Sequence, residues 1–395
     1  MSQSPGSKAV TIRYTLDNEP AVITLDVTTN GVSIGGANID RLVGDVNRVV
    51  QPGVREIRWR PDKSWPGHVV SNNAVRAVVT AWATDVPPDY VVFDTVGKGG
   101  ALYYQSADFL PDGGLTNPVY KTDRLVMRRI PAAGVTWRMG SPVNEPERFT
   151  GDYRYNPPKN EGTHLVRLTK DYYIGIYELT QKQYLNLVGS NGSSYRGAGW
   201  ETHPWENANY YHIRRDTWIP SKEWPEKPLA EKDIPLSVMR DKLGVDVDLP
   251  TEAMWEYAAR AGSGTGLPFG LDIVWGDTGE NVDRFAWHKD NSDLVTHEVG
   301  LKEPNAWGLY DMLGNVWEWC IDQYADNYAA TPGEVSVDPK GCEIRSTSTR
   351  AIRGGSGDGP VWHCRLASRS GNWTASTATG TPWRGMRLAA PAIAK

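Results

Sequence analysis

The sequence predicts an α+β protein in which an all-β sandwich precedes a loop-rich mixed domain. Short strands separated by Gly, Asn and Pro turns fill residues 1–97. Capped helices appear only after residue 122, in a domain that runs to residue 395. The stretch 304–319 holds three tryptophans and two carboxylates in sixteen residues, a composition typical of a buried irregular loop. Residues 98–121, rich in glycine at their start, are predicted to be a linker.

The first domain is predicted from period-two alternation of apolar residues. Regularly spaced short strands with turn residues between them are typical of an immunoglobulin-like sandwich. The predicted strands are 9–16, 21–27, 32–34, 55–60, 75–82 and 90–93. No catalytic cluster appears among them, so this domain is interpreted as a stalk, scaffold or partner contact.

The second domain is predicted to alternate short strands with three helices. Thr180 and Thr251 are predicted N-caps, and Glu252 suits the first turn of a helix because a carboxylate is favourable there. The predicted strands are 124–131, 165–168 and 172–176, and the predicted helices are 181–188, 235–243 and 252–261.

Composition excludes several classes of function. The net charge of −5 gives no basic footprint for nucleic acid, and no apolar run reaches the length of a membrane span. The N-terminal residues 1–7 do not resemble a signal peptide, and the compartment (cytoplasm, virion or cell surface) is not predicted. Three cysteines do not form a disulfide framework. Cys320 and Cys364 are interpreted as buried free thiols rather than a disulfide, and Cys342 lies in a polar loop.

Two interpretations are open for the carboxylates of the stretch 304–319. Asp311 and Glu318 cannot be buried unless they are paired, hydrogen-bonded or bound to a metal. They either bond backbone amides of a core loop or, with carbonyl oxygens of Gly314 and Val316, hold a structural calcium ion.

Six motifs, in order, resemble the formylglycine-generating-enzyme family, a branch of the C-type lectin-like fold. The strongest is the sequence from Gly308 to Trp319, GLYDMLGNVWEW. The others begin at Met139, Tyr173, Leu249, Arg353 and Gly385, and the resemblance covers residues 120–390. It implies a C-type lectin-like second domain. It does not specify the activity, because one fold hosts many functions.

The resemblance also bears on metals. The family's oxidases bind copper through two cysteines between the Gly-Gly-Ser and Arg-x-Ala-x-Arg motifs. Here that interval contains only Cys364, next to Arg365, and Val361 stands nearest the second copper position. No copper is therefore expected. A related branch uses iron held by histidines, but His203 and His212 are nine residues apart and are interpreted as loop or core residues.

The C-terminal interval between Gly354 and Gly385 contains no Lys, Glu, Gln or Met. The residues there are largely those reachable from an Asn codon by changing its adenines. This composition resembles the variable region of diversity-generating-retroelement variable proteins, which bind ligands on the same fold without catalysis. The alternative is a loop-rich C-terminus that happens to lack long polar side chains.

The sequence therefore predicts a non-catalytic protein that binds a protein or glycan ligand. Small polar residues with interspersed tryptophans suit such a face. The alternative is a copper-dependent, formylglycine-generating oxidase or a related O₂-dependent enzyme. The predicted face comprises Asp358, Val361, Trp362, His363, Ser368, Ser370, Asn372, Trp373, Thr374, Ser376, Thr377, Thr379, Thr381 and Trp383, of which Trp383 is also interpreted as a core residue.

Overall fold

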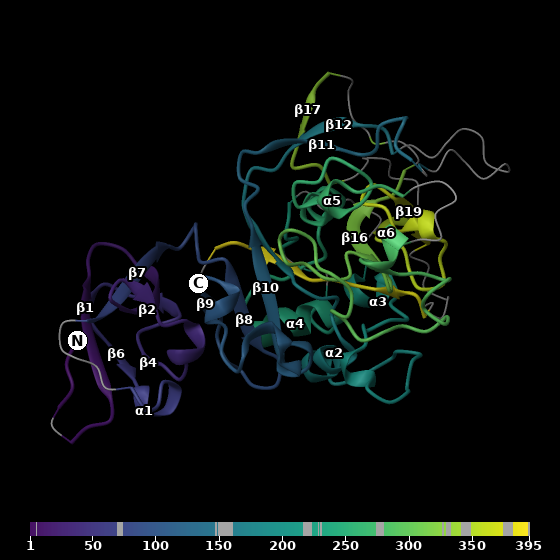
Figure 1. The fold of residues 1–395 in the computed structure, drawn as a ribbon. Helices are drawn as coiled ribbons and strands as arrows, with labels where there is room; N and C mark the ends of the chain where they lie inside the picture. Colours follow the sequence, from purple (N-terminus) through teal and green to yellow (C-terminus); the bar gives the residue numbers. More distant parts are fainter. Residues whose placement is uncertain are drawn as a thin grey trace.

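The computed structural model describes most of the chain and resolves it into two lobes (Figure 1). The described residues are 1–4, 6–68, 74–146, 148, 161–215, 223–227, 229, 231–273, 280–325, 328, 333–340, 349–373 and 382–393, without the side chains of residues 372 and 373.

The N-terminal lobe contains two antiparallel sheets around one apolar core. One has the order β1-β6-β4, and in the other β2 pairs with β3, β5 and β7. Alternation along β1 and β6 turns Ile12, Ile57 and Trp59 inward, where each is at most 3% exposed. The elements are β1 (Val10–Leu16), β2 (Ala21–Thr29), β3 (Val32–Ser33), β4 (Val43–Gly44), β5 (Arg48–Val50), β6 (Gly53–Trp59), α1 (Pro61–Ser64) and β7 (Val75–Ala83). The immunoglobulin-like character of this lobe stays a prediction.

A five-stranded sheet of order β21-β13-β10-β8-β9 joins the two lobes. Its strands are β8 (Tyr90–Asp94), β9 (Leu102–Tyr104), β10 (Arg124–Ile130), β13 (Tyr172–Gly175) and β21 (Ala389–Pro391). The sequence prediction gave β8 to the first domain and residues 98–121 to a linker. In the structure β8 lies between β9 and β10, which pair with both of its edges. Val91 and Val92 point to opposite faces of this sheet and are buried in two different cores.

Three smaller sheets complete the C-terminal lobe. A four-stranded sheet has the order β19-β18-β16-β20, a three-stranded sheet has the order β11-β12-β17, and β14 pairs with β15. Their strands are β11 (Thr136–Met139), β12 (His164–Arg167), β14 (Ala286–Trp287), β15 (Leu313–Gly314), β16 (Trp317–Gln323), β17 (Val335–Val337), β18 (Thr349–Arg353), β19 (Arg369–Trp373) and β20 (Arg384–Gly385).

The three predicted helices are confirmed. Thr180 caps α2 in a reciprocal capping box with Gln183, and the Thr251 hydroxyl accepts a hydrogen bond from the Met254 amide. The helices are α2 (Gln181–Val188), α3 (Tyr210–Arg214), α4 (Pro235–Leu243), α5 (Glu252–Arg260) and α6 (Glu280–Asp283). Short 3₁₀ turns are η1 (Gly36–Asn38), η2 (Ala107–Phe109), η3 (Gly114–Thr116), η4 (Pro118–Lys121), η5 (Trp200–Thr202), η6 (Pro268–Gly270) and η7 (Val361–His363).

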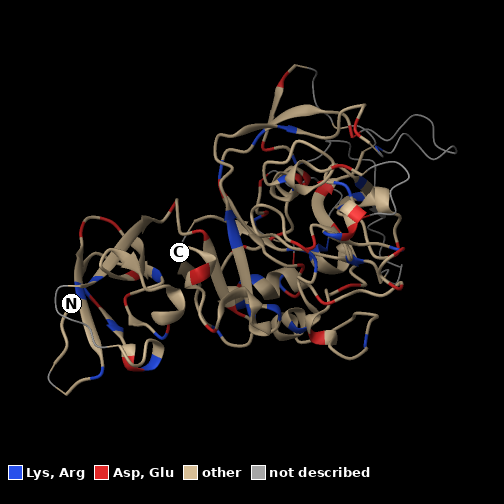
Figure 2. Ribbon diagram, in the orientation of Figure 1, with Lys and Arg blue, Asp and Glu red and all other residues tan. Residues whose placement is uncertain are grey.

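Charged residues of both signs are interspersed over both lobes (Figure 2). The arginines of β10 illustrate this, since Arg129 forms ion pairs with Asp89 at 2.9 Å and Asp171 at 2.8 Å. None of the helices in the described part of the chain combines the length and apolarity that crossing a membrane requires.

Candidate functional site

The C-terminal motifs form a rigid frame built on buried arginines. Arg353, at the end of β18, is fully buried. Its Nη1 donates to the carbonyl oxygens of Ala367 at 2.9 Å and Ser368 at 2.8 Å, and its Nη2 pairs with the Glu256 carboxylate. Because Glu256 lies on α5, one guanidinium ties the Arg-x-Ala-x-Arg segment to both a strand and a helix.

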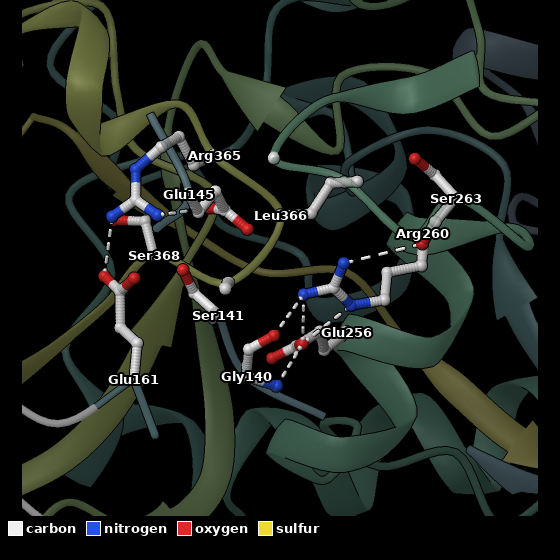
Figure 3. Close-up of polar contacts among 12 residues, drawn as sticks. Gly140, Ser141, Glu145, Glu161, Glu256, Arg260, Ser263, Arg365, Leu366 and Ser368 are labelled. Atoms are coloured by element: carbon white, nitrogen blue, oxygen red, sulfur yellow. Dashed lines mark hydrogen bonds and ion pairs between the residues drawn. The ribbon is translucent and has the colours of Figure 1, made fainter. Parts of the chain in front are cut away.

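The two arginines of the Arg-x-Ala-x-Arg segment itself, Arg365 and Arg369, are also held by buried carboxylates. Arg365 is fully buried between Glu145 and Glu161, with N–O distances of 2.8 Å to each (Figure 3). The guanidinium of Arg369 donates to both carboxylate oxygens of Glu252 at 2.6 Å. Breaking a buried ion pair leaves an uncompensated charge, so these contacts fix the backbone on which the predicted face stands.

The loop that follows β18 is fixed through its backbone. The amide of Gly357 donates to the Asn315 carbonyl at 2.9 Å, and the Ser292 hydroxyl donates to the Gly357 carbonyl at 2.6 Å. The amide of Lys289 donates to the Gly359 carbonyl at 3.0 Å. Segments far apart in sequence therefore hold this loop in one conformation.

The predicted face is exposed where this loop runs into η7. Trp362 is 38% exposed, and Asp358 is also exposed. Val361, His363 and Trp383 are half-buried. The rings of Trp362 and His363 meet edge to face with their centroids 6.4 Å apart. The result is an exposed aromatic side chain on a stiff, mainly small-residue platform.

Ser368 does not belong to this face. It is only 4% exposed, because its carbonyl oxygen accepts from the buried Arg353 and holds the segment in the core. Ser370 is half-buried on β19, and Asn372 and Trp373 end that strand, with side chains that are not described. The remaining predicted face residues lie outside the described residues: Thr374, Ser376, Thr377, Thr379 and Thr381.

Sequence reasoning missed a second segment beside the face. Leu294 and Val295 are 62% and 41% exposed, in the loop whose Ser292 is bonded to Gly357. The sequence does contain one signal for this segment, because Leu294 and Val295 are two adjacent apolar residues in an otherwise polar stretch. Their placement beside Gly357 depends on contacts across more than sixty residues, which periodicity does not reveal.

Of the groups assigned to calcium, the Glu318 carboxylate binds a guanidinium. Arg387 donates to Glu318 through Nη2 at 2.7 Å and through Nε at 3.0 and 3.1 Å. It also donates to the Asp311 carbonyl at 3.2 Å, while Trp255 Nε1 donates to Glu318 at 2.6 Å. Asp311 accepts from the Gly300 amide at 2.6 Å, and burial raises the pKa of Asp311 to about 6. The interpretation that these carboxylates bond core groups therefore holds for Glu318 and for Oδ2 of Asp311, whereas Oδ1 of Asp311 is buried without a hydrogen-bond partner.

The amides of Gly314 and Val316, whose carbonyl oxygens were assigned to calcium, bond to segments distant in the sequence. The Gly314 amide donates to the Gly354 carbonyl at 2.8 Å, and the Val316 amide donates to Glu178 at 3.1 Å. The buried charge of Glu318 is balanced by an arginine, which meets the electrostatic requirement that suggested a metal. Calcium binding at this loop stays an untested hypothesis.

The described thiols are in the core. Cys320 and Cys364 are fully buried and unbonded, as predicted, and Cys342 lies outside the described residues. Burial raises the pKa of the Cys320 thiol and raises that of Cys364 to about 12. A raised pKa disfavours the thiolate, the form in which cysteine binds metals.

His203 and His212, the histidines considered as metal ligands, pack against neighbouring aromatic residues. The His203 ring stacks on Tyr195 with centroids 4.0 Å apart, and burial lowers the pKa of His203 to about 4. His212 lies 3.4 Å from the Tyr184 hydroxyl. Within the residues that the structure describes, no three His, Cys, Asp or Glu side chains are grouped so as to hold a metal ion.

Comparison with known proteins identifies the family. Residues 133–392 match the sulfatase-modifying factor enzyme 1-like domain of the FGE-sulfatase family, a span of more than half of the chain. The chain therefore belongs to this family, as its motifs predicted.

Individual relatives carry different names. The chaperone protein LppX of Paenibacillus barcinonensis is 31% identical over 188 residues, which are 39% of this chain and 63% of that protein. This chain thus matches less than two thirds of that relative's length. The formylglycine-generating enzyme of Thermomonospora curvata is 28% identical over 294 residues, 64% of this chain and 90% of the enzyme.

Two solved structures are also similar. Variable protein 1 of Treponema denticola has 27% identity and a TM-score of 0.46, covering 68% of this chain and 95% of that one. PvdO from Pseudomonas aeruginosa has 24% identity and a TM-score of 0.49, covering 68% and 94%.

Proposed function

We propose that this chain is a non-catalytic ligand-binding protein whose C-terminal loops form the binding face. The observation that carries the proposal is the position of Trp362. Its side chain is exposed, and it follows a loop whose backbone forms hydrogen bonds with Asn315 and Lys289. A large aromatic ring loses little side-chain entropy on binding and is a typical anchor at interfaces. Leu294 and Val295 are also exposed, in the loop that Ser292 bonds to Gly357.

The charge distribution suits a binding face better than a reactive centre. The buried arginines of the frame are each paired with carboxylates or carbonyl oxygens, so their charges stabilise the scaffold. Asp358 is exposed, and its Oδ1 accepts from the Ser356 hydroxyl at 2.6 Å. The ligand class that these features support is a protein or glycan with an apolar patch and hydrogen-bond donors.

We further propose that the face is diversified by a retroelement. The support is the composition of the interval between Gly354 and Gly385, which lacks Lys, Glu, Gln and Met. A near-identical copy of the corresponding DNA beside a reverse transcriptase gene is expected in the source genome. A genome without such a copy would remove the diversification and leave the binding face.

A second candidate is a copper-dependent oxidase, which the likeness to the Thermomonospora enzyme over 90% of its length favours. Against it, the interval between the Gly-Gly-Ser and Arg-x-Ala-x-Arg motifs has one cysteine, Cys364, and that thiol is buried. Titration of the full chain with Cu(I) against a chelator, followed by incubation with a cysteine peptide and O₂, separates the two. We expect neither stoichiometric copper uptake nor an aldehyde product, and both together would establish the oxidase.

Binding itself is tested with a glycan array and a phage-displayed peptide library. A ligand enriched on the wild-type protein should be lost with Trp362→Ser and kept with Val54→Ser. Val54 is 77% exposed on β6 of the other lobe, so it controls for the loss of any exposed apolar side chain. Equal binding by both variants would place the ligand elsewhere.

A further inference from the structure

A cavity of about 200 Å³ lies where the two lobes meet. It is lined by β2 and the segment 39–48 of the N-terminal lobe and by β9 and η2 on the other side. Leu25, Ile39 and Phe109 give it apolar walls. At the volume of liquid water the space corresponds to about six or seven molecules, which suits a small ligand.

Asp40 lines this cavity and has an unsatisfied oxygen. Its Oδ1 is buried and has no hydrogen-bond partner, and in the described part of the chain Asp40 forms no ion pair. Burial raises the pKa of this carboxyl group. A buried acceptor without a donor costs free energy, and a donor supplied by a ligand would remove that cost. The next residue, Arg41, has φ of 59°, a strained conformation for a non-glycine residue.

Two positive charges border the same cavity. Arg41 and Arg48 both line it and both are exposed, and among the described residues neither forms an ion pair with a carboxylate, although the charge of Arg41 offsets part of the rise that burial causes in the pKa of Asp40. One carboxylate and two guanidinium groups around a small, partly apolar space complement a molecule that carries an ammonium group and a carboxylate. An amine alone would meet the two arginines, and a carboxylate alone would meet Asp40.

We infer that this cavity binds a free α-amino acid with a small side chain. The ammonium group donates to Oδ1 of Asp40, and the carboxylate faces Arg41 and Arg48. The side chain contacts the apolar walls. Because the cavity is contributed by both lobes, binding would also stabilise their contact. This site is independent of the C-terminal face.

Thermal unfolding and calorimetry of the full chain test the inference. The probes are glycine, L-alanine, L-serine and L-valine, with ethylamine and acetate as one-charge controls. At least one amino acid should raise the unfolding midpoint with concentration, while ethylamine and acetate bind at least tenfold more weakly. Absence of binding by all four amino acids, or equal binding by ethylamine or acetate, would overturn the inference.

Variants locate the site. Asp40→Asn should weaken amino-acid binding at least tenfold, whereas Asp17→Asn, at an exposed turn of the same lobe, should leave it unchanged. Arg48→Gln should also weaken binding, and it is the deciding variant if Asp40→Asn does not fold. Unchanged affinity in Asp40→Asn, or in Arg48→Gln in that case, would show that the ligand binds elsewhere.

Discussion

Arg387 and Glu318 form a buried ion pair that joins the last motif of the chain to its central one, with Nη2 and Oε1 2.7 Å apart. Their side chains are 0% and 1% exposed. The same guanidinium donates to the Gly175 carbonyl at 2.9 Å and to the Tyr310 carbonyl at 2.8 Å. One side chain thus connects β13, the central loop and β16.

Replacing this arginine should destabilise the protein strongly. Arg387→Met leaves Glu318 charged and buried without its partner, which typically costs about 3–5 kcal/mol of unfolding free energy. Urea unfolding followed by tryptophan fluorescence measures the loss. Arg284→Met is the matched control, since its pair with Glu303 is 46% and 52% exposed and should change the midpoint little. Similar losses in both variants would contradict the proposed importance of burial.

Alanine substitutions at two glycines distinguish the energetic cost of backbone strain from the cost of a close contact. Gly314 has φ of 77°, and a Cβ there would lie 2.2 Å from the Trp287 carbonyl oxygen. Gly189, after α2, has φ of 84° with open space around it. Gly189→Ala should cost about 1 kcal/mol from strain alone, whereas Gly314→Ala should cost at least about 2 kcal/mol more because backbone atoms must move. Equal unfolding midpoints would show that the contact relaxes freely.

The stability of the protein should fall as pH rises, in part through Asp322. This residue is 2% exposed, and burial followed by the charge of Glu252 raises the pKa of Asp322 from 3.8 to about 8. A raised pKa means that the folded state holds the proton more tightly than the unfolded state. Its contribution is therefore fully present below about pH 4 and is lost as pH rises through 8.

Asp322→Asn should remove this dependence. The amide oxygen can still accept the hydrogen bond from the Glu252 amide, which is 2.7 Å long in the wild type. The stability of the variant relative to the wild type should increase by on the order of 1 kcal/mol per pH unit between pH 5 and 8. Unfolding midpoints at four pH values measure it, and parallel curves would contradict the expected titration.

Chelation tests the calcium prediction for the loop of Asp311 and Glu318. Because Arg387 already neutralises Glu318, we expect EDTA to leave the thermal midpoint of the full chain unchanged. A fall in EDTA that calcium restores, and that Asp311→Asn abolishes, would instead establish an ion at this loop. Magnesium added in place of calcium controls for ionic strength.

The sequence by itself determined the family frame and the local elements. Thr180 and Thr251 start helices because a side-chain oxygen and the backbone amides it caps are only three residues apart. The motifs around Gly308, Arg353 and Gly385 identified the family, because their residues and their order along the chain can be read without knowing any tertiary contact. The single cysteine of the copper interval was equally visible without a structure.

Only the tertiary structure decided which distant residues meet. It placed β8 in the central sheet, buried Ser368 in contact with Arg353, and bonded Ser292 to the loop of Gly357. It also supplied Arg387 as the cation of the central loop. These relationships depend on burial and on pairing across long sequence separations, and local periodicity carries no information about the partner.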